Sequence, residues 1–203
     1  GLVDAARAHD GRPALRLGGT KVSFAEVDDA SARVAAMLRG RGLQPGDRVA
    51  IMLPNMLSFP PIYYGVLRAG GVVVPMNPTN PAAAMAHELR ESGAIAIVAT
   101  PTARKALRDI DWTTLPEVAH FIGAGFEPGP LGLLFDDLVT HEPTPIVDRS
   151  PDDVAVLIFT SGTAGSPRPA MLTHGNLFTN IRQTLAADER VQEPDDVVFG
   201  MLP

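Results

Sequence analysis

The chain alternates between two spacings of hydrophobic residues. Between residues 24 and 39, apolar positions recur every three or four residues, which predicts an amphipathic helix. Residues 49–53, 72–74 and 94–99 are instead short continuous apolar runs, which are typical of strands buried on both faces. We therefore expect helices and buried strands to follow one another along the chain.

Capping and turn residues stand where the spacing changes. Ser23 and Glu26 have the separation of a capping box, and Gly40 follows the helix that they begin. Asn80 is a candidate N-cap, with Pro81 at the first helical position, where a missing N–H costs nothing. The other expected elements are helices over 58–69, 104–108 and from Gly175 or Asn176 onward, and strands over 118–122, up to Phe159, and over 197–203.

This alternation predicts an α/β protein with a mostly parallel sheet layered with helices on both faces. Residues 1–150 would form the first α/β layers and a connector, and residues 151–203 a strand, a loop and the helix that follows. The connector, over 123–150, is rich in Gly and Pro and carries one short apolar segment at 131–138. Because the chain begins with Gly and ends in an apolar segment, we expect it to be part of a longer protein.

Composition excludes several classes of function. The 203 residues are 45% hydrophobic and 20% charged, which is typical of a globular protein and not of a disordered one. The net charge is −6 without a run of basic residues, so neither nucleic acid nor an anionic membrane is an expected partner. With no cysteine, thiol nucleophiles and thiolate metal sites are excluded. Because neither a transmembrane segment nor a signal-peptide core is present, we expect a cytoplasmic protein.

The segment most suggestive of chemistry follows the strand that ends at Phe159. It reads Thr160-Ser161-Gly162-Thr163-Ala164-Gly165-Ser166-Pro167-Arg168. Small residues let backbone N–H groups approach phosphate oxygens, hydroxyls add donors, and a guanidinium can bind a phosphate through two charge-assisted hydrogen bonds. A plain connecting loop is the alternative interpretation from the residues alone.

The residue spacing excludes three other ligand-binding or catalytic motifs. The segment lacks the Gly-x-x-x-x-Gly-Lys-Ser/Thr pattern of the usual P-loop. Ser161 has Phe159 where a hydrolase nucleophile elbow requires Gly. The pair Gly123 and Gly125 lacks the third glycine of a dinucleotide fingerprint.

The segment, followed by Met171-Leu172-Thr173-His174, resembles the phosphate-loop signature of the AMP-forming acyl-adenylating superfamily, in particular its acyl-CoA synthetases. Further matches occur upstream in the order and spacing of that family's N-terminal region: Ser23-Phe24-Ala25-Glu26, Pro45-Gly46-Asp47-Arg48-Val49-Ala50, Leu53-Pro54-Asn55, Tyr64-Gly65-Val66-Leu67-Arg68-Ala69-Gly70-Gly71 and Val74-Pro75-Met76-Asn77-Pro78. The resemblance covers nearly the whole chain. It implies the incomplete N-terminal domain of an adenylate-forming enzyme.

The resemblance also implies a reaction and its residues. A carboxylic acid and Mg·ATP would give acyl-AMP and pyrophosphate, and the acyl group would pass to CoA. Thr160, Ser161, Gly162, Thr163, Ala164, Gly165 and Arg168 would bind the ATP phosphates, with Thr163 and Arg168 in catalytic roles. The family's adenine site, ribose site and mobile C-terminal domain would lie beyond Pro203, so this chain alone is expected to be inactive. We also expect it to expose apolar faces and to self-associate through them.

The segment departs from the family pattern at three positions. Ala164 replaces a Thr, Arg168 replaces the usual Lys, and Pro169 replaces a Gly. Pro169 fixes its own φ, has no N–H and restricts the residue before it. It is the best support for an alternative from another class, a non-catalytic ligand-binding or interaction module that keeps the fold. An unrelated phosphotransferase is a second alternative.

The other titratable residues suggest structural roles. We expect His174 to cap or orient the helix that follows it. The acidic pairs at 136–137, 152–153 and 195–196 are interpreted as solvated turns or helix starts, and no metal site is expected.

Overall fold

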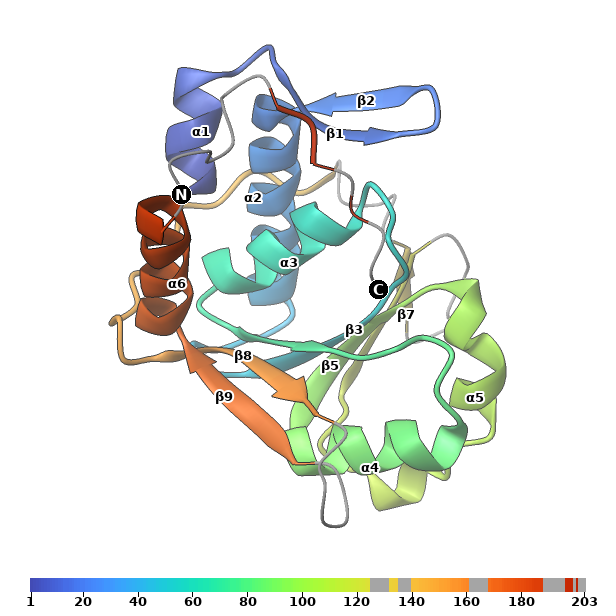
Figure 1. Cartoon of the computed structure of the whole chain (residues 1–203). Coiled ribbons are helices and arrows are strands. Elements are labelled where there is room, and N and C mark those ends of the chain that lie inside the picture. Colours follow the sequence, from blue (N-terminus) through green and yellow to red (C-terminus); the bar gives the residue numbers. More distant parts are fainter. Residues whose placement is uncertain (125–131, 135–139, 161–167, 188–195, 199, 201–203) are drawn as a thin grey trace.

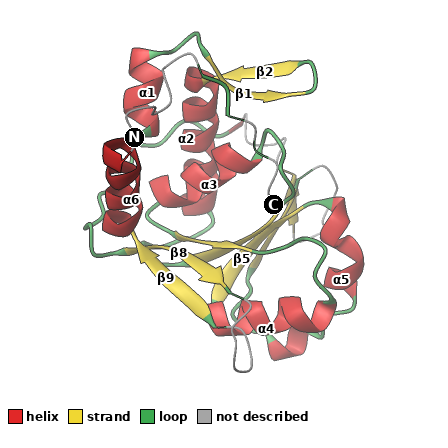
Figure 2. Ribbon diagram, in the orientation of Figure 1, coloured by secondary structure: helices red, strands yellow, loops and turns green. Residues whose placement is uncertain are grey.

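The fold is built on a seven-stranded sheet with the order β7-β6-β5-β3-β4-β8-β9 (Figures 1 and 2). Every neighbouring pair is parallel except β8 and β9, which are antiparallel. The structure is a computed structural model and describes residues 1–124, 132–134, 140–160, 168–187, 196–198 and 200. The predicted α/β class with a mostly parallel sheet is confirmed.

The strands and helices have the following bounds. The strands are β1 Pro13–Leu17, β2 Thr20–Ser23, β3 Arg48–Met52, β4 Val72–Pro75, β5 Ala94–Ala99, β6 His120–Gly123, β7 Gly132–Leu134, β8 Val154–Phe159 and β9 Pro169–Thr173. The helices are α1 Leu2–Ala8, α2 Phe24–Gly40, α3 Phe59–Arg68, α4 Ala82–Ser92, α5 Arg104–Arg108 and α6 His174–Ala187, with short 3₁₀ turns at Pro101–Ala103 and Trp112–Thr114.

Helices cover both faces of the sheet because the central strands are apolar on both sides. In β3, Val49 and Ile51 belong to the core beneath α2 and α3, whereas Ala50 and Met52 belong to the core beneath α4 and α5. All four side chains are fully buried. Figure 1 shows α2 and α3 on one side of the sheet and α4 and α5 on the other.

The two helices on the first face are fixed to each other by a close approach and an ion pair. Gly65 of α3 lies directly against the side chain of Val34 in α2. At the end of α3, Arg68 reaches back to α2, where its Nη1 donates to Asp28 Oδ1 over 2.7 Å and to Ser31 Oγ over 2.9 Å. Both charged side chains are largely buried, so the pair is protected from solvent screening.

The described end of the connector, residues 140–150, runs along α2 and α3. The Thr144 N–H donates to the Ala32 carbonyl, and the Val147 N–H donates to the Arg68 carbonyl. The Arg33 and Arg39 guanidiniums also donate to this segment, at the His141 carbonyl and the Thr144 hydroxyl. The connector thereby leads the chain back across α2 and α3 to the start of β8.

Several sequence predictions are confirmed in detail. Ser23 Oγ accepts from the Glu26 N–H, while the Glu26 carboxylate accepts from the Ser23 N–H, which completes the capping box. The strand predicted over 94–99 and the helix predicted over 104–108 have the expected bounds.

The predicted start of α4 is wrong by one residue. Pro81, in an extended conformation, is the N-cap, and the helix begins at Ala82. Asn80 instead donates from Nδ2 to Glu88 Oε1 over 3.1 Å. Burial raises the pKa of this Glu88 carboxyl, which lies on the sheet side of α4.

The strand predicted over 197–203 is not found in its described part, since residues 196–198 have no regular structure. The sequence interpretation also missed α1, the β1–β2 hairpin and β9. Within the part of the chain that the structure describes, no helix is both long and apolar enough to cross a membrane.

The contact between α2 and α3 can be tested at Gly65. A Cβ at this position would overlap the Val34 side chain, so Gly65→Ala is expected to lower the free energy of unfolding by about 1–3 kcal/mol. Urea denaturation followed by circular dichroism measures the change. Gly40→Ala is the matched control, because a Cβ there meets no atom within 4 Å and stability should be unchanged or slightly raised. Equal stability of the two variants would contradict this packing.

Candidate functional site

The antiparallel pair β8–β9 holds the two ends of the predicted phosphate segment. Thr160 directly follows β8 and Arg168 directly precedes β9, and both residues are exposed. Ser161, Gly162, Thr163, Ala164 and Gly165 lie outside the described residues.

The register of the two strands brings Thr160 and Arg168 together. The last registered pair is Phe159 with Pro169, so the next residues outward, Thr160 and Arg168, face each other across the same hairpin. Directly opposite residues in such a pair have Cα atoms about 4.5–5.5 Å apart. A hydroxyl and a guanidinium are therefore placed at the same end of the sheet, where a ligand could contact both.

This end is the carboxyl edge of the parallel strands. β8 runs parallel to β4, with Val73 beside Val156, and β4 runs parallel to β3. In open α/β sheets, ligands bind outside the carboxyl ends of the strands. Thr160 and Arg168, the two described residues of the predicted phosphate segment, thus lie at the edge at which such folds bind ligands.

Pro169 occupies a position that tolerates proline. It is the first residue of β9, and β9 is the edge strand of the sheet. Edge strands and strand starts are where proline's missing N–H is least costly. Because a residue before proline is biased toward an extended backbone, Pro169 also restricts the conformations of Arg168.

The other end of the hairpin is fixed to α6. The His174 N–H donates to the Asp153 carbonyl over 3.0 Å, and the Gly175 N–H donates to the Pro151 carbonyl over 2.8 Å. Thr173 and Asn176 then cap α6 reciprocally: each backbone N–H donates to the other's side-chain oxygen, over 3.0 and 3.1 Å. Of the two roles predicted for His174, capping is wrong, because α6 begins at His174 and Thr173 and Asn176 provide the cap. Its N–H bond to Asp153 holds the start of the helix, in keeping with the orienting role.

The acidic pair 152–153 has the turn role expected of it. Asp153 Oδ2 accepts from the Ser150 N–H over 2.8 Å and lies 3.1 Å from Arg149 Nε. That arginine nitrogen lacks the geometry of a hydrogen bond, so the contact is an ion pair only. Among the described residues, no group of three or more His, Asp or Glu side chains could hold a metal ion.

His174 is the titratable residue of this region with a perturbed environment. Its Nε2 is buried and has no hydrogen-bond partner among the described residues. Burial lowers the pKa of His174, the neighbouring Arg149 charge lowers it further, and Asp153 opposes both effects. His174 is therefore held as the neutral imidazole.

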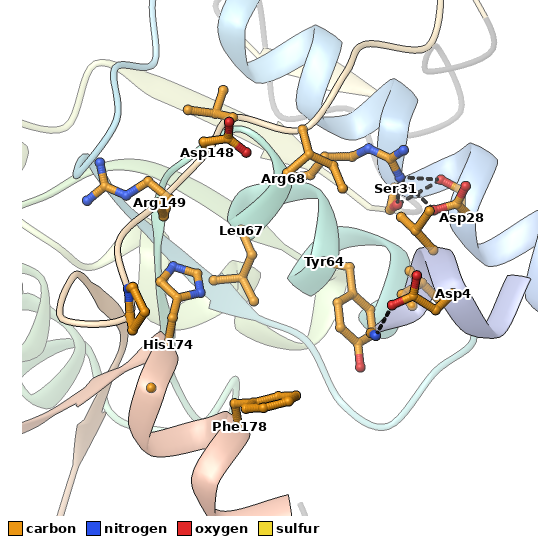
Figure 3. A pocket seen from close by; sticks show the side chains of 17 residues that line it. Asp4, Asp28, Ser31, Tyr64, Leu67, Arg68, Asp148, Arg149, His174 and Phe178 are labelled. Carbon is orange, nitrogen blue, oxygen red and sulfur yellow. Dashed lines mark hydrogen bonds and ion pairs between the residues drawn. The ribbon is translucent and has the colours of Figure 1, made fainter.

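A cavity of about 650 Å³ lies at the His174 end of the hairpin (Figure 3). Its wall is mainly apolar and comes from α1, α2, α3, the connector and α6; Tyr64, Leu67, Val147, His174 and Phe178 are among its lining residues. The six residues of β8 separate it from Thr160 by about 20 Å. Of the residues singled out from sequence, His174 lines the cavity together with Tyr64, Leu67 and Arg68 of the upstream family matches, whereas Thr160 and Arg168 do not line it.

Comparison with known proteins gives a family and close relatives. The family model of the AMP-binding enzymes matches residues 2–203. A feruloyl-CoA synthase from Amycolatopsis sp is 36% identical over 93% of this chain and 36% of its own length. A long-chain-fatty-acid–CoA ligase from Bacillus subtilis (strain 168) is 31% identical over 100% of this chain and 41% of its own length. The chain thus spans about two fifths of the relatives it matches.

Solved structures share the fold. Apo MbtA from Mycobacterium smegmatis superposes with a TM-score of 0.78 at 31% identity, over 86% of this chain and 33% of that one. ATP-bound MatB from Rhodopseudomonas palustris superposes with a TM-score of 0.70 at 29% identity, over 83% of this chain and 33% of that one.

The environment of His174 predicts a pH dependence of stability. Because its pKa is lowered in the folded state, the unfolded chain binds a proton at higher pH, and stability should fall as pH decreases below about 6.5. His174→Gln removes this proton uptake while keeping a polar side chain. Urea denaturation between about pH 8 and pH 5 should show a smaller loss of stability for the variant than for the wild type. Parallel pH profiles would contradict the burial of a neutral imidazole.

Proposed function

The chain belongs to the AMP-binding enzyme family, and we propose that it supplies the ATP phosphate-binding segment of an AMP-forming acid–CoA ligase. The observation that carries the proposal is the placement of Thr160 and Arg168 opposite each other at the carboxyl edge of the sheet. Relatives named as long-chain-fatty-acid–CoA ligases and as feruloyl-CoA synthase support the reaction class.

In the proposed reaction, a carboxylate oxygen attacks the α-phosphorus of ATP. The bond between the α-phosphorus and the bridging oxygen breaks, and that oxygen leaves with its electron pair as part of pyrophosphate. The acyl-AMP then transfers its acyl group to the CoA thiol, and AMP leaves. Negative charge grows on the leaving pyrophosphate, so donors placed in advance around it stabilise the transition state.

The residues of this chain would act on the β- and γ-phosphates. Arg168 is exposed and makes no ion pair with another described residue, so its guanidinium is free to bind phosphate oxygens in a bidentate manner. The Thr160 hydroxyl would add a donor from the opposite strand. Ser161, Gly162, Thr163, Ala164 and Gly165 would complete the site, with Thr163 and Arg168 in the catalytic roles.

Mg²⁺ would arrive with ATP. Phosphate oxygens and water molecules would supply most of its ligands. The acid would be a fatty or other small carboxylic acid, since the relatives named above include ligases of fatty and of aromatic acids.

The alternative of a non-catalytic module rested on Pro169. At the first position of an edge strand, proline leaves the sheet intact and favours an extended Arg168 beside Thr160. We therefore favour a functional phosphate segment.

Pyrophosphate binding tests this assignment on the chain itself. Arg168→Ala is expected to weaken pyrophosphate binding about tenfold or more, because a charge-assisted hydrogen bond contributes about 1.5–3 kcal/mol. Isothermal titration calorimetry in the presence of Mg²⁺ measures the affinity. Arg16→Ala, an equal charge change on the exposed face of β1, is the matched control and should bind like the wild type. Equal weakening by both variants would reduce the effect to net charge and overturn the assignment.

Complete adenylation should be beyond this chain alone. It spans about two fifths of its relatives, so we propose that the remaining groups that bind adenine, ribose and the acid lie in the rest of the protein. With any carboxylic acid, ATP–pyrophosphate exchange should not exceed the background rate. A full-length relative such as the Bacillus subtilis ligase is the positive control, and exchange by the 203-residue chain would refute this part of the proposal.

A further inference from the structure

Asn77 lies just beyond the carboxyl end of β4, the strand beside β8. The Met76 N–H donates to the Ile51 carbonyl of β3 over 2.9 Å, so the hydrogen bonding of the sheet continues to the residue before Asn77. Asn77 itself is exposed, whereas Met76 and Pro78 on either side of it are buried. Its side chain is therefore presented to solvent at the same edge of the sheet as Thr160.

The register of the sheet places Asn77 in a row with the two described residues of the phosphate segment. Val73 of β4 pairs with Val156 of β8, which pairs with Leu172 of β9. These three side chains belong to the core beneath α2 and α3 or pack against it, so the row faces one side of the sheet. Residues an even number apart along a strand share a face. Four residues nearer the carboxyl edge, the same register gives a second, exposed row on that face: Asn77, Thr160 and Arg168.

The Asn77 side chain is held in one orientation. Its Oδ1 accepts from the Thr79 N–H over 2.9 Å and from the Thr79 hydroxyl over 2.7 Å. The turn is closed by the Asn80 N–H, which donates to the Asn77 carbonyl, and Asn80 is in turn bound to the buried Glu88 of α4. Because a backbone N–H needs an acceptor, the amide oxygen faces the turn. The Asn77 Nδ2 has no hydrogen-bond partner among the described residues, so its donor hydrogens are left for a ligand.

We propose that Asn77 is a further ligand-binding residue of the phosphate site and that its Nδ2 donates to an oxygen of the departing pyrophosphate group. This inference rests on the function proposed above. Neighbouring strands lie about 4.7–4.9 Å apart, so the row of three residues is about 10 Å long. An amide, a hydroxyl and a guanidinium along it all donate to phosphate oxygens. Since negative charge grows on pyrophosphate as it leaves, a donor fixed in advance stabilises the transition state.

The turn alone does not require an amide at this position. Asn and Asp both form turns in which the side-chain oxygen accepts from the backbone two residues later. The bonds to Thr79 use only Oδ1, so an aspartate at position 77 would preserve them. The two roles of Asn77, turn formation and ligand binding, can therefore be separated by one substitution.

Asn77→Asp keeps the turn but replaces the donor by a negative charge that repels phosphate. We expect this variant to bind inorganic pyrophosphate more than about tenfold more weakly than the wild type, and Asn77→Ala about tenfold more weakly, because a hydrogen bond to a charged group is lost. Isothermal titration calorimetry measures both affinities in EDTA and again in Mg²⁺, since a carboxylate at position 77 could bind the metal. Asn180→Asp, an equal charge change on the exposed surface of α6, should stay within about twofold of the wild type.

A second measurement needs no altered turn. In a ¹H–¹⁵N spectrum of the wild type, the side-chain amide signal of Asn77, assigned by its absence in Asn77→Ala, should shift when pyrophosphate is added. The signal of Asn180 should not shift.

Arg168→Ala, titrated beside these variants, distinguishes the possible failures. Weaker binding in Arg168→Ala with wild-type affinity in Asn77→Asp and an unmoved Asn77 signal would overturn the role of Asn77 and leave the phosphate segment as assigned. Weaker binding in Asn77→Ala alone would reduce Asn77 to a turn former. A wild type that binds no pyrophosphate would overturn the proposed function, and the role of Asn77 with it.

Discussion

Burial of β3 on both faces is the constraint on which the rest of the structure depends. Its four residues Val49 to Met52 expose no surface, and successive side chains enter opposite cores. A strand of this kind requires neighbours on both edges and helices on both faces. β4 and β5 meet the first requirement, and the α2–α3 and α4–α5 layers meet the second. The parallel direction of the sheet then places all the carboxyl ends of β3, β4, β5 and β8 at one edge.

The candidate phosphate site depends on this edge in turn. β8 is anchored beside β4, and its hydrogen-bonded partner β9 returns antiparallel to it. Because β9 returns antiparallel to β8, Thr160 and Arg168 lie opposite each other. At the far end of the hairpin, the Thr173 and Asn176 cap fixes the start of α6. The hairpin therefore has Thr160 and Arg168 at one end and the cavity at the other.

The sequence was most informative where local and global signals agreed. The capping box of Ser23 begins a helix that also packs on the sheet. The apolar run over 94–99 has the residue types of a strand and also the burial that the centre of the sheet requires. The sequence was misleading where the same residue types are compatible with two structures. Pro169 and the residues after it suggested a loop that leads into a helix, but they form an edge strand. Asn80 is a good N-cap residue whose side chain is instead bound to Glu88.

The cavity had no sequence signal, because its wall comes from five separate segments of the chain. The residues of the phosphate segment were identified by resemblance, and the position of Thr160 opposite Arg168 followed from the register of β8 and β9. Hydrogen–deuterium exchange of the chain with and without Mg·pyrophosphate tests the central claim most directly. The account predicts protection in peptides that contain Thr160 and Arg168, with unchanged exchange around the cavity. Protection centred on α1, α3 and α6, or no protection at any concentration of ligand, would contradict it.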